Sequence, residues 1–112
     1  MQADYAEQVR QGQVFVVGES QMIVGFVVFY PQGDHLHLEN VAVRSTHQGR
    51  GYGGRLIAYV EEQAKRYGLA AVELYTNEKM HENIAMYRKL GYVECARRNV
   101  DGYDRVYFRK AL

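Results

Sequence analysis

The sequence is poor in several of the residues that stabilise or anchor specialised proteins. Its 112 residues include a single cysteine, Cys95, one proline and no tryptophan. One cysteine cannot form an intrachain disulfide, which excludes a disulfide-stabilised scaffold and fits a reducing compartment. The 14 basic and 13 acidic side chains leave a formal charge of +1. Such a balance gives no reason to expect nucleic acid or an anionic membrane as a partner.

Long hydrophobic runs are also lacking. The longest, residues 22–30, is interrupted by Gly25 and falls well short of the roughly 20 residues that span a bilayer. It also lacks the charged leader of a signal peptide. We therefore expect a cytoplasmic protein that does not associate with membranes, and we expect residues 1–112 to form one domain.

Glycine, by contrast, is plentiful and divides the chain into short elements. We predict helices over 4–11, 53–67 and 79–90, and strands over 14–17, 22–30, 35–43, 70–76, 92–98 and 103–110. The strand over 22–30 is nearly all apolar, which predicts cover on both faces. The strand-helix-strand order in the middle predicts a parallel pair, and Asp101-Gly102 predicts a hairpin. The fold class is α+β, with a mixed, mostly antiparallel sheet.

The strand over 35–43 changes its pattern part-way. Leu36 and Leu38 share one face, but beyond Asn40 the apolar positions become Val41 and Val43. Because side chains alternate between faces along a strand, this change of parity predicts a β-bulge. The alternative is a strand end that is buried on both faces.

A glycine-rich segment, Gln-Gly-Arg-Gly-Tyr-Gly-Gly over 48–54, separates this strand from the next predicted helix. Without side chains, its backbone N–H groups could approach a bulky anion, and the positive end of the helix points to the same place. A diphosphate would suit such a site. A strand-to-helix turn without a ligand is the alternative reading.

A dinucleotide-binding fingerprint is a second interpretation of these glycines. Gly49, Gly51 and Gly54 satisfy G-x-G-x-x-G, and Glu73 follows about twenty residues later. However, the polar segment 44–48 separates the glycines from the strand, and Glu73 falls inside a strand rather than at its tip. No Gly-Lys-Ser/Thr follows, so a P-loop is excluded.

Two motifs together resemble the GCN5-related N-acetyltransferase (GNAT) superfamily. Val-Ala-Val over 41–43, followed by Gln48-x-x-Gly51-x-Gly53, resembles its acetyl-CoA motif, [QR]-x-x-G-x-[GA] after a bulged strand. Met-Tyr-Arg-Lys-Leu-Gly-Tyr over 86–92 resembles its second signature, a Leu-Tyr-x-x-Leu-Gly-Phe type run. The resemblance covers about 13–112 and implies a GNAT-like sheet with a central β-α-β acetyl-CoA unit.

Acetyl-CoA is the co-substrate that the resemblance implies, bound largely by main chain. The backbone N–H of Val41 would bind the thioester carbonyl, and Val43 would pair with the pantetheine arm. Arg50 and Arg55 would add charge near the phosphates; solvated helix-end arginines are the alternative. The other implied binding residues are Ala42, Gln48, Gly49, Gly51, Tyr52, Gly53, Gly54 and Asn83.

The implied reaction is direct transfer of the acetyl group to a primary amine on a small molecule or peptide. Tyr87 is then the candidate general acid, although a core tyrosine on an apolar helix stripe is the alternative. Glu39 and His37 share a strand face just before the predicted bulge, and either could accept the proton of the amine. Together with Tyr87 they are the candidate catalytic residues.

Other chemistries have weaker support. His35 and His37 have the i,i+2 spacing of a metal pair, but no third ligand is evident in the sequence, so no metal is expected. Cys95 could carry an acyl group, yet nothing nearby would lower its pKa. We expect Cys95 to be a buried structural residue.

The sequence departs from the family pattern in two places. The family opens with a strand and two helices before the first hairpin, whereas one short helix is predicted here, which indicates shortened N-terminal elements. An Asn common at the start of the second helix falls on Met80. A homodimer could complete the acceptor side, and a non-catalytic acyl-CoA-binding module or a ligand-free domain are alternative functions.

Overall fold

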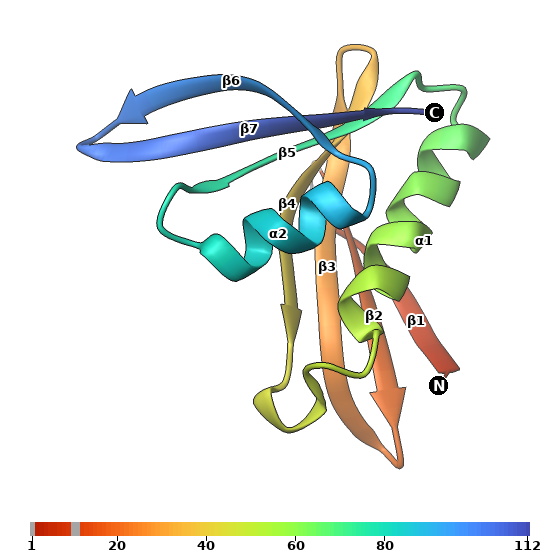
Figure 1. The fold of residues 1–112 in the computed structure, drawn as a ribbon. Coiled ribbons are helices and arrows are strands. Elements are labelled where there is room, and N and C mark those ends of the chain that lie inside the picture. Colours follow the sequence, from red (N-terminus) through yellow and green to blue (C-terminus); the bar gives the residue numbers. More distant parts are fainter. Residues whose placement is uncertain (1, 10–11) are drawn as a thin grey trace.

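The computed structural model describes residues 2–9 and 12–112 as one mixed sheet with two helices packed on one face (Figure 1). The elements in chain order are β1 (Gln2–Val9), β2 (Gly12–Glu19), β3 (Met22–Gln32), β4 (His35–Val43), η1 (Ser45–His47), α1 (Tyr52–Arg66), β5 (Ala71–Asn77), α2 (His81–Lys89), β6 (Val93–Val100) and β7 (Tyr103–Ala111).

The seven strands lie in the order β1-β2-β3-β4-β5-β7-β6. Only β4 and β5 are parallel, and α1 connects them. All the other neighbours pair antiparallel, and β6 and β7 meet at a turn in which Asp101 and Gly102 both have positive φ. The predicted α+β class, the parallel pair and the Asp-Gly hairpin are therefore confirmed.

The predicted helix over 4–11 is wrong. Residues 2–9 form strand β1, which pairs antiparallel with β2 from Gln2↔Gly18 to Val9↔Gly12, while 10–11 lie outside the described residues. Helix propensity is a weak local preference, and pairing with the edge of β2 gives this backbone its hydrogen bonds instead. The other elements are present, with ends that differ from the predictions by up to two residues.

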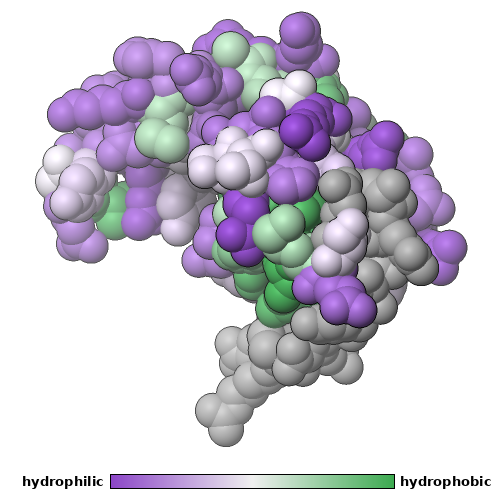
Figure 2. Space-filling model, turned by 90° about the horizontal axis from the view of Figure 1, so that it is seen from below, coloured by the Kyte–Doolittle hydropathy of each residue, from purple (hydrophilic) through white to green (hydrophobic). Residues whose placement is uncertain are grey.

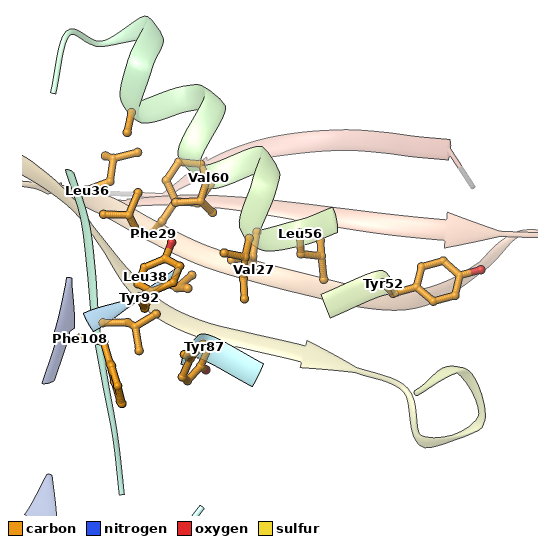
Figure 3. Packing of buried hydrophobic residues seen from close by; sticks show 14 of the residues in the cluster. Val27, Phe29, Leu36, Leu38, Tyr52, Leu56, Val60, Tyr87, Tyr92 and Phe108 are labelled. Carbon is orange, nitrogen blue, oxygen red and sulfur yellow. The ribbon is translucent and has the colours of Figure 1, made fainter. Parts of the chain in front are cut away.

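The core lies between the sheet and the two helices (Figure 3). Its largest fully buried side chains come from β3, β4, α1, β5 and β7: Phe29, Leu36, Leu56, Ile57, Leu74 and Phe108. Gly25 lets α1 approach the sheet, because a Cβ at this position would lie 2.9 Å from the Ala42 carbonyl oxygen and 3.2 Å from Leu56 Cδ1.

Strand β3 is not covered on both faces as predicted. Val24, Val27 and Phe29 are buried, whereas Phe26 and Val28 on the opposite face are only half-buried. Both helices pack on the first face, so the second face has no helical cover within the described part of the chain. Figure 2 shows, from below, a mostly hydrophilic surface in which hydrophobic residues gather near the middle of the view.

Two hydrogen bonds to Glu61 connect α1 to β7 and to Tyr92, the residue just before β6. Glu61 accepts hydrogen bonds from Tyr92, at 2.9 Å, and from Lys110, at 3.1 Å. Burial, followed by the charge of Glu61, raises the pKa of Tyr92, so its hydroxyl stays protonated and donates. Neither helix in the described residues is long and apolar enough to cross a bilayer.

Candidate active site

The predicted bulge in β4 is confirmed and falls at Glu39. Val28 of β3 lies opposite Asn40, while the next residue, Phe29, lies opposite Leu38. Glu39 is therefore the extra residue in the antiparallel pair, and the alternation of side chains resets after it. Leu38 before the bulge and Val41 and Val43 after it consequently all pack on the core side of the sheet.

Strands β4 and β5 separate at the same point. Their parallel pairing runs from His35↔Ala71 to Leu38↔Leu74 and then stops, whereas β5 continues along β7 to Asn77↔Arg105. Figure 1 shows β4 turning away from β5, β7 and β6. Beyond Leu38, β4 therefore has a strand neighbour only on its β3 side among the described residues, which leaves one backbone edge for another hydrogen-bonding group.

The segment after β4 is held by bonds to the ends of β3 and β4. The Arg44 backbone N–H donates to the Val24 carbonyl at 2.7 Å, and its side-chain Nε donates to the Ile23 carbonyl at 3.1 Å. The Gln48 amide donates to the Val43 carbonyl at 3.0 Å. The side chain of Gln48 thus connects the loop to the end of the strand.

The glycine loop itself is open. Gly49 and Gly51 have φ values of +80° and +87°, and a Cβ at either position would meet no atom within 4 Å. Glycine is favoured at both positions because of the positive φ, and not because a larger side chain would clash with a neighbour. Helix α1 begins directly after Gly51, at Tyr52, whose ring is buried and meets the His47 ring edge-on at 5.8 Å.

The first turn of α1 lies against α2. A Cβ on Gly53 would be 3.6 Å from Met86 Sδ, and one on Gly54 would be 3.9 Å from Leu90 Cδ2. Arg50 and Arg55 are exposed at this end of the helix, and Asn83 is half-buried on α2. The structure therefore brings the loop and α2 together, as the two sequence motifs predict.

Tyr87 of α2 is part of the core, with 6% of its surface exposed. Its ring lies 6.3 Å from Tyr92 and 6.0 Å from Phe108 (Figure 3). Burial raises the pKa of the Tyr87 hydroxyl, so it stays protonated at neutral pH. Tyr87 can therefore be both a packed core residue and a protonated phenol that is able to donate its proton.

Glu39 is joined to two side chains on the open face of the sheet. One carboxylate oxygen, Oε2, lies 3.1 Å from His37 Nε2 and accepts a hydrogen bond from the Tyr30 hydroxyl at 3.2 Å. Burial lowers the pKa of His37, and the opposing effect of Glu39 is smaller. His37 is therefore a neutral imidazole at neutral pH, which can exchange a proton with Glu39.

A pocket of about 430 Å³ opens beside this group. Four aromatic rings line it in a row, in the order Tyr30, His37, Tyr75, Tyr107. The distances between successive ring centroids are 5.2, 5.6 and 5.4 Å. Arg98 lies at the Tyr107 end. The sequence motifs do not include Tyr30, Tyr75, Tyr107 or Arg98; only their register across neighbouring strands brings them to one place.

A family model described as the acetyltransferase (GNAT) family matches residues 2–92. The chain belongs to the GNAT acetyltransferase family. The open β4 edge, the glycine loop and α2 occur in the order that its two motifs predict.

Individual relatives agree with this assignment. The chain is 23% identical over 87 residues to a protein named Uncharacterized N-acetyltransferase YvbK from Bacillus subtilis strain 168, covering 77% of this chain and 56% of the relative. It is 30% identical over 70 residues to an IAA acetyltransferase from Azospirillum brasilense, covering 62% of this chain and 46% of the relative. The chain thus spans about half the length of the curated relatives that it matches.

Solved structures show the same fold. A GNAT family acetyltransferase from Elizabethkingia anophelis with acetyl-CoA bound matches with a TM-score of 0.84 and 21% identity, over 91% of this chain and 77% of that one. The GNAT fold that the resemblance implies is therefore confirmed, including the mixed sheet and the central β-α-β unit.

Glu73, a carboxylate on the same face of this GNAT sheet, is bound to another side chain of the protein. Arg109 donates to Glu73 and, at 3.0 Å, to Asp34. Hydrogen bonds from Arg109 and then His35 lower the pKa of Asp34 to about 2. Asp34, His35 and Glu73 could offer ligand atoms within 4.8 Å of one another, but both carboxylates already accept hydrogen bonds from the Arg109 guanidinium.

Cys95 is exposed, contrary to the prediction of a buried structural residue. It is the unmatched residue of a second irregularity, where Glu94 lies opposite Phe108 and Ala96 opposite Tyr107. The distortion turns its side chain outward. Partial desolvation, with a smaller effect of Glu73, raises the pKa of the thiol, so the chain does not activate it as a nucleophile.

Proposed function

We propose that this chain transfers the acetyl group of acetyl-CoA to a primary amine by direct attack in a ternary complex. The observation that carries the proposal is the bulge at Glu39, where β4 leaves β5. At this one position the strand presents a free backbone edge on one side and a carboxylate facing an aromatic pocket on the other. Two substrates could meet there, and close placement supplies much of the acceleration of such a transfer.

The residues around the glycine loop suit a long thioester with a diphosphate. In the described part of the chain this β4 edge has no strand neighbour beyond Leu38, and although the Val43 carbonyl accepts a bond from Gln48, the backbone groups at Val41 and the Val43 N–H can hydrogen-bond an extended amide chain. A Cβ on Gly49 or Gly51 would meet no atom within 4 Å, so the loop backbone is open to a ligand. The N-terminus of α1 favours negative charge, to which Arg50 and Arg55 would add. Ala42, Tyr52, Gly53, Gly54 and Asn83 complete the proposed site.

Glu39 and His37 are the proposed base. An amine is mostly protonated at neutral pH and must lose a proton before it attacks. The Glu39 carboxylate can accept that proton, directly or through water, and the neutral imidazole of His37 at 3.1 Å can share it. The amine nitrogen then bonds to the thioester carbon, and it loses a second proton to water as the tetrahedral intermediate collapses to the amide.

Tyr87 is the proposed acid. When the carbon–sulfur bond breaks, the electron pair stays on sulfur, and a donated proton stabilises the departing thiolate. The Tyr87 hydroxyl is protonated at neutral pH because burial raises its pKa. Its proton would be replaced from solvent after the products leave. No step in this proposal requires a metal ion.

Calorimetric titration of the purified chain with acetyl-CoA, with NADH as the control ligand, tests the binding half. Release of CoA thiol in the presence of a panel of amines tests the transfer. Binding without release for any amine would favour a non-catalytic acyl-CoA-binding module, for which the open face of the sheet is the supporting observation. No binding would reject both functions.

Tyr87→Phe tests the acid. The phenylalanine ring keeps the packing against Tyr92 and Phe108, so we expect acetyl-CoA affinity to remain within a factor of about two while turnover falls by ten- to a hundredfold. Tyr92→Phe is the matched control, since its hydroxyl is bound to Glu61. If turnover is unchanged in Tyr87→Phe, the hydroxyl is not the acid.

A further inference from the structure

The aromatic pocket has ends of opposite charge. Glu39 and His37 lie at one end, and Arg98 lies at the other, with its guanidinium 5.2 Å from the centre of the Tyr107 ring. Glu73 also lines the pocket, but its carboxylate is already paired with Arg109. A ligand in this pocket would therefore meet a carboxylate at one end and a guanidinium at the other.

Arg98 differs from Arg97, Arg88 and Arg109 in its partners. Arg97 binds Glu94 at 2.8 Å, Arg88 binds the same carboxylate at 3.3 Å, and Arg109 binds Asp34. Among residues 2–9 and 12–112, the structure shows no carboxylate in an ion pair with Arg98. Its guanidinium carbon lies over the Tyr107 ring, a contact that leaves the guanidinium N–H groups for a ligand.

The separation of the two ends sets the length of a ligand that could reach both. Strands β4, β5, β7 and β6 are consecutive neighbours in the sheet, and β4 has left β5 at Glu39. The backbones that carry Glu39 and Arg98 are therefore at least three strand spacings, or ~14 Å, apart. Both side chains project into the pocket and shorten this distance. An α-amino acid, whose amine and carboxylate share one carbon, could not reach both ends.

We propose that the acceptor is an amine that carries a carboxylate or phosphate several bonds from the reactive nitrogen, with Arg98 binding this oxyanion. The guanidinium fork is suited to two parallel hydrogen bonds with either group. The rings of Tyr75 and Tyr107 lie between the two ends and contact the chain that links them. This assignment rests on the proposed function, because it places the reactive amine beside Glu39.

Three matched acceptors test the proposal: 6-aminohexanoate, 6-aminohexyl phosphate and the neutral 6-aminohexanol. In the wild-type chain we expect kcat/KM for at least one of the two anions to exceed that for the alcohol by tenfold or more, which corresponds to about 1.4 kcal/mol. The anion with the larger value distinguishes a carboxylate site from a phosphate site.

Arg98→Gln should abolish this preference by lowering kcat/KM for the anionic amines at least tenfold more than for 6-aminohexanol. Arg97→Gln is the matched control. It removes the same charge from the next residue, but Arg97 lies opposite the buried Val106 and pairs with Glu94, whereas Arg98 lies opposite Arg105. A wild-type chain that favours the alcohol, or an Arg98→Gln variant that loses activity equally for all three amines, would overturn the proposal.

A binding experiment separates this inference from the proposed function. The acetylated products of the two anionic amines cannot react further, and their affinity can be measured by calorimetry without acetyl-CoA. Binding that falls at least tenfold in Arg98→Gln but not in Arg97→Gln would support the oxyanion site even if no amine releases CoA. Rapid acetylation of all three amines together with binding that is independent of Arg98 would reject the oxyanion site and keep the transferase.

Discussion

The glycine-loop region, residues 39–55, and the pocket face, which comprises Tyr30, His37, Glu39, Tyr75, Arg98 and Tyr107, are built in different ways. The first is one continuous segment whose proposed ligand-binding groups are main-chain atoms, positioned by a bulge and by glycines at positive φ. The second collects side chains from five strands, β3 to β7. Main-chain groups, as in the glycine-loop region, suit a ligand that stays the same when side chains change. The pocket face, which is built from side chains, can change its ligand by substitution.

Glu39→Gln should give the largest effect, because Glu39 belongs to both regions. The amide keeps the size of the side chain but cannot accept the proton of the amine, so we expect turnover to fall by about a hundredfold or more. Acetyl-CoA affinity should remain unchanged. Glu62→Gln, on the exposed side of α1, is the control. A pH–rate profile that is identical in Glu39→Gln would remove Glu39 from the mechanism.

Gly25→Ala tests whether the main-chain region depends on close packing beneath it. The new Cβ would lie 2.9 Å from the Ala42 carbonyl oxygen, so either β4 or α1 must move, and we expect a loss of about 1–3 kcal/mol in the free energy of unfolding. Urea denaturation measures this. Gly53→Ala, whose Cβ would make an ordinary 3.6 Å contact with Met86, should not destabilise; an equal loss in both would contradict the explanation.

Gly51→Ala separates the conformational role of the loop from its role in binding. Gly102, in the β6–β7 turn, has φ +84° against +87° for Gly51, and a Cβ would meet no atom within 4 Å at either position. Both alanine variants should therefore lose a similar ~1–2 kcal/mol in the free energy of unfolding. Only Gly51→Ala should also weaken acetyl-CoA binding, by about tenfold in calorimetry. Equal binding in the two variants would show that the loop is only a turn.

The pocket face should respond to pH through His37. Burial lowers the pKa of this residue in the folded state, so the unfolded chain takes up a proton near pH 6.5 while the folded chain does not. Stability is therefore lost as the pH falls from about 6.5 towards the folded-state pKa. His37→Gln should flatten this part of the stability curve, and His81→Gln, which replaces an exposed histidine on α2, is the control. An unchanged slope in His37→Gln would contradict the linkage.

The two regions also differ in how far the sequence predicts them. The bulge leaves a change of parity between Leu38 and Val41, and the loop leaves a run of glycines, so both can be recognised locally. Arg98 and Tyr107 leave no such trace, because their proximity to His37 depends on the register of four strands. The same limit explains Glu73, whose partner Arg109 lies 36 residues away.

Failures in the fold predictions have related causes. The segment 4–11 carries residues that favour a helix, but pairing with β2 makes 4–9 part of a strand. Cys95 was expected to be buried because cysteine usually is, and a register shift between Glu94 and Ala96 exposes it instead. Local preferences gave the correct element wherever glycines or helical periodicity were strong, as in α1.

The bulge at Glu39 also makes the number of residues in β4 important. Side chains alternate along a strand, so one extra residue decides the face of every residue that follows. Removing Asn40 would allow simple alternation with Val41 and Val43 still facing α1, but it would remove the bulge that sets β4 apart from its β3 register. In this strand the number of residues, as much as their identity, determines which side chains face α1 and which face the pocket.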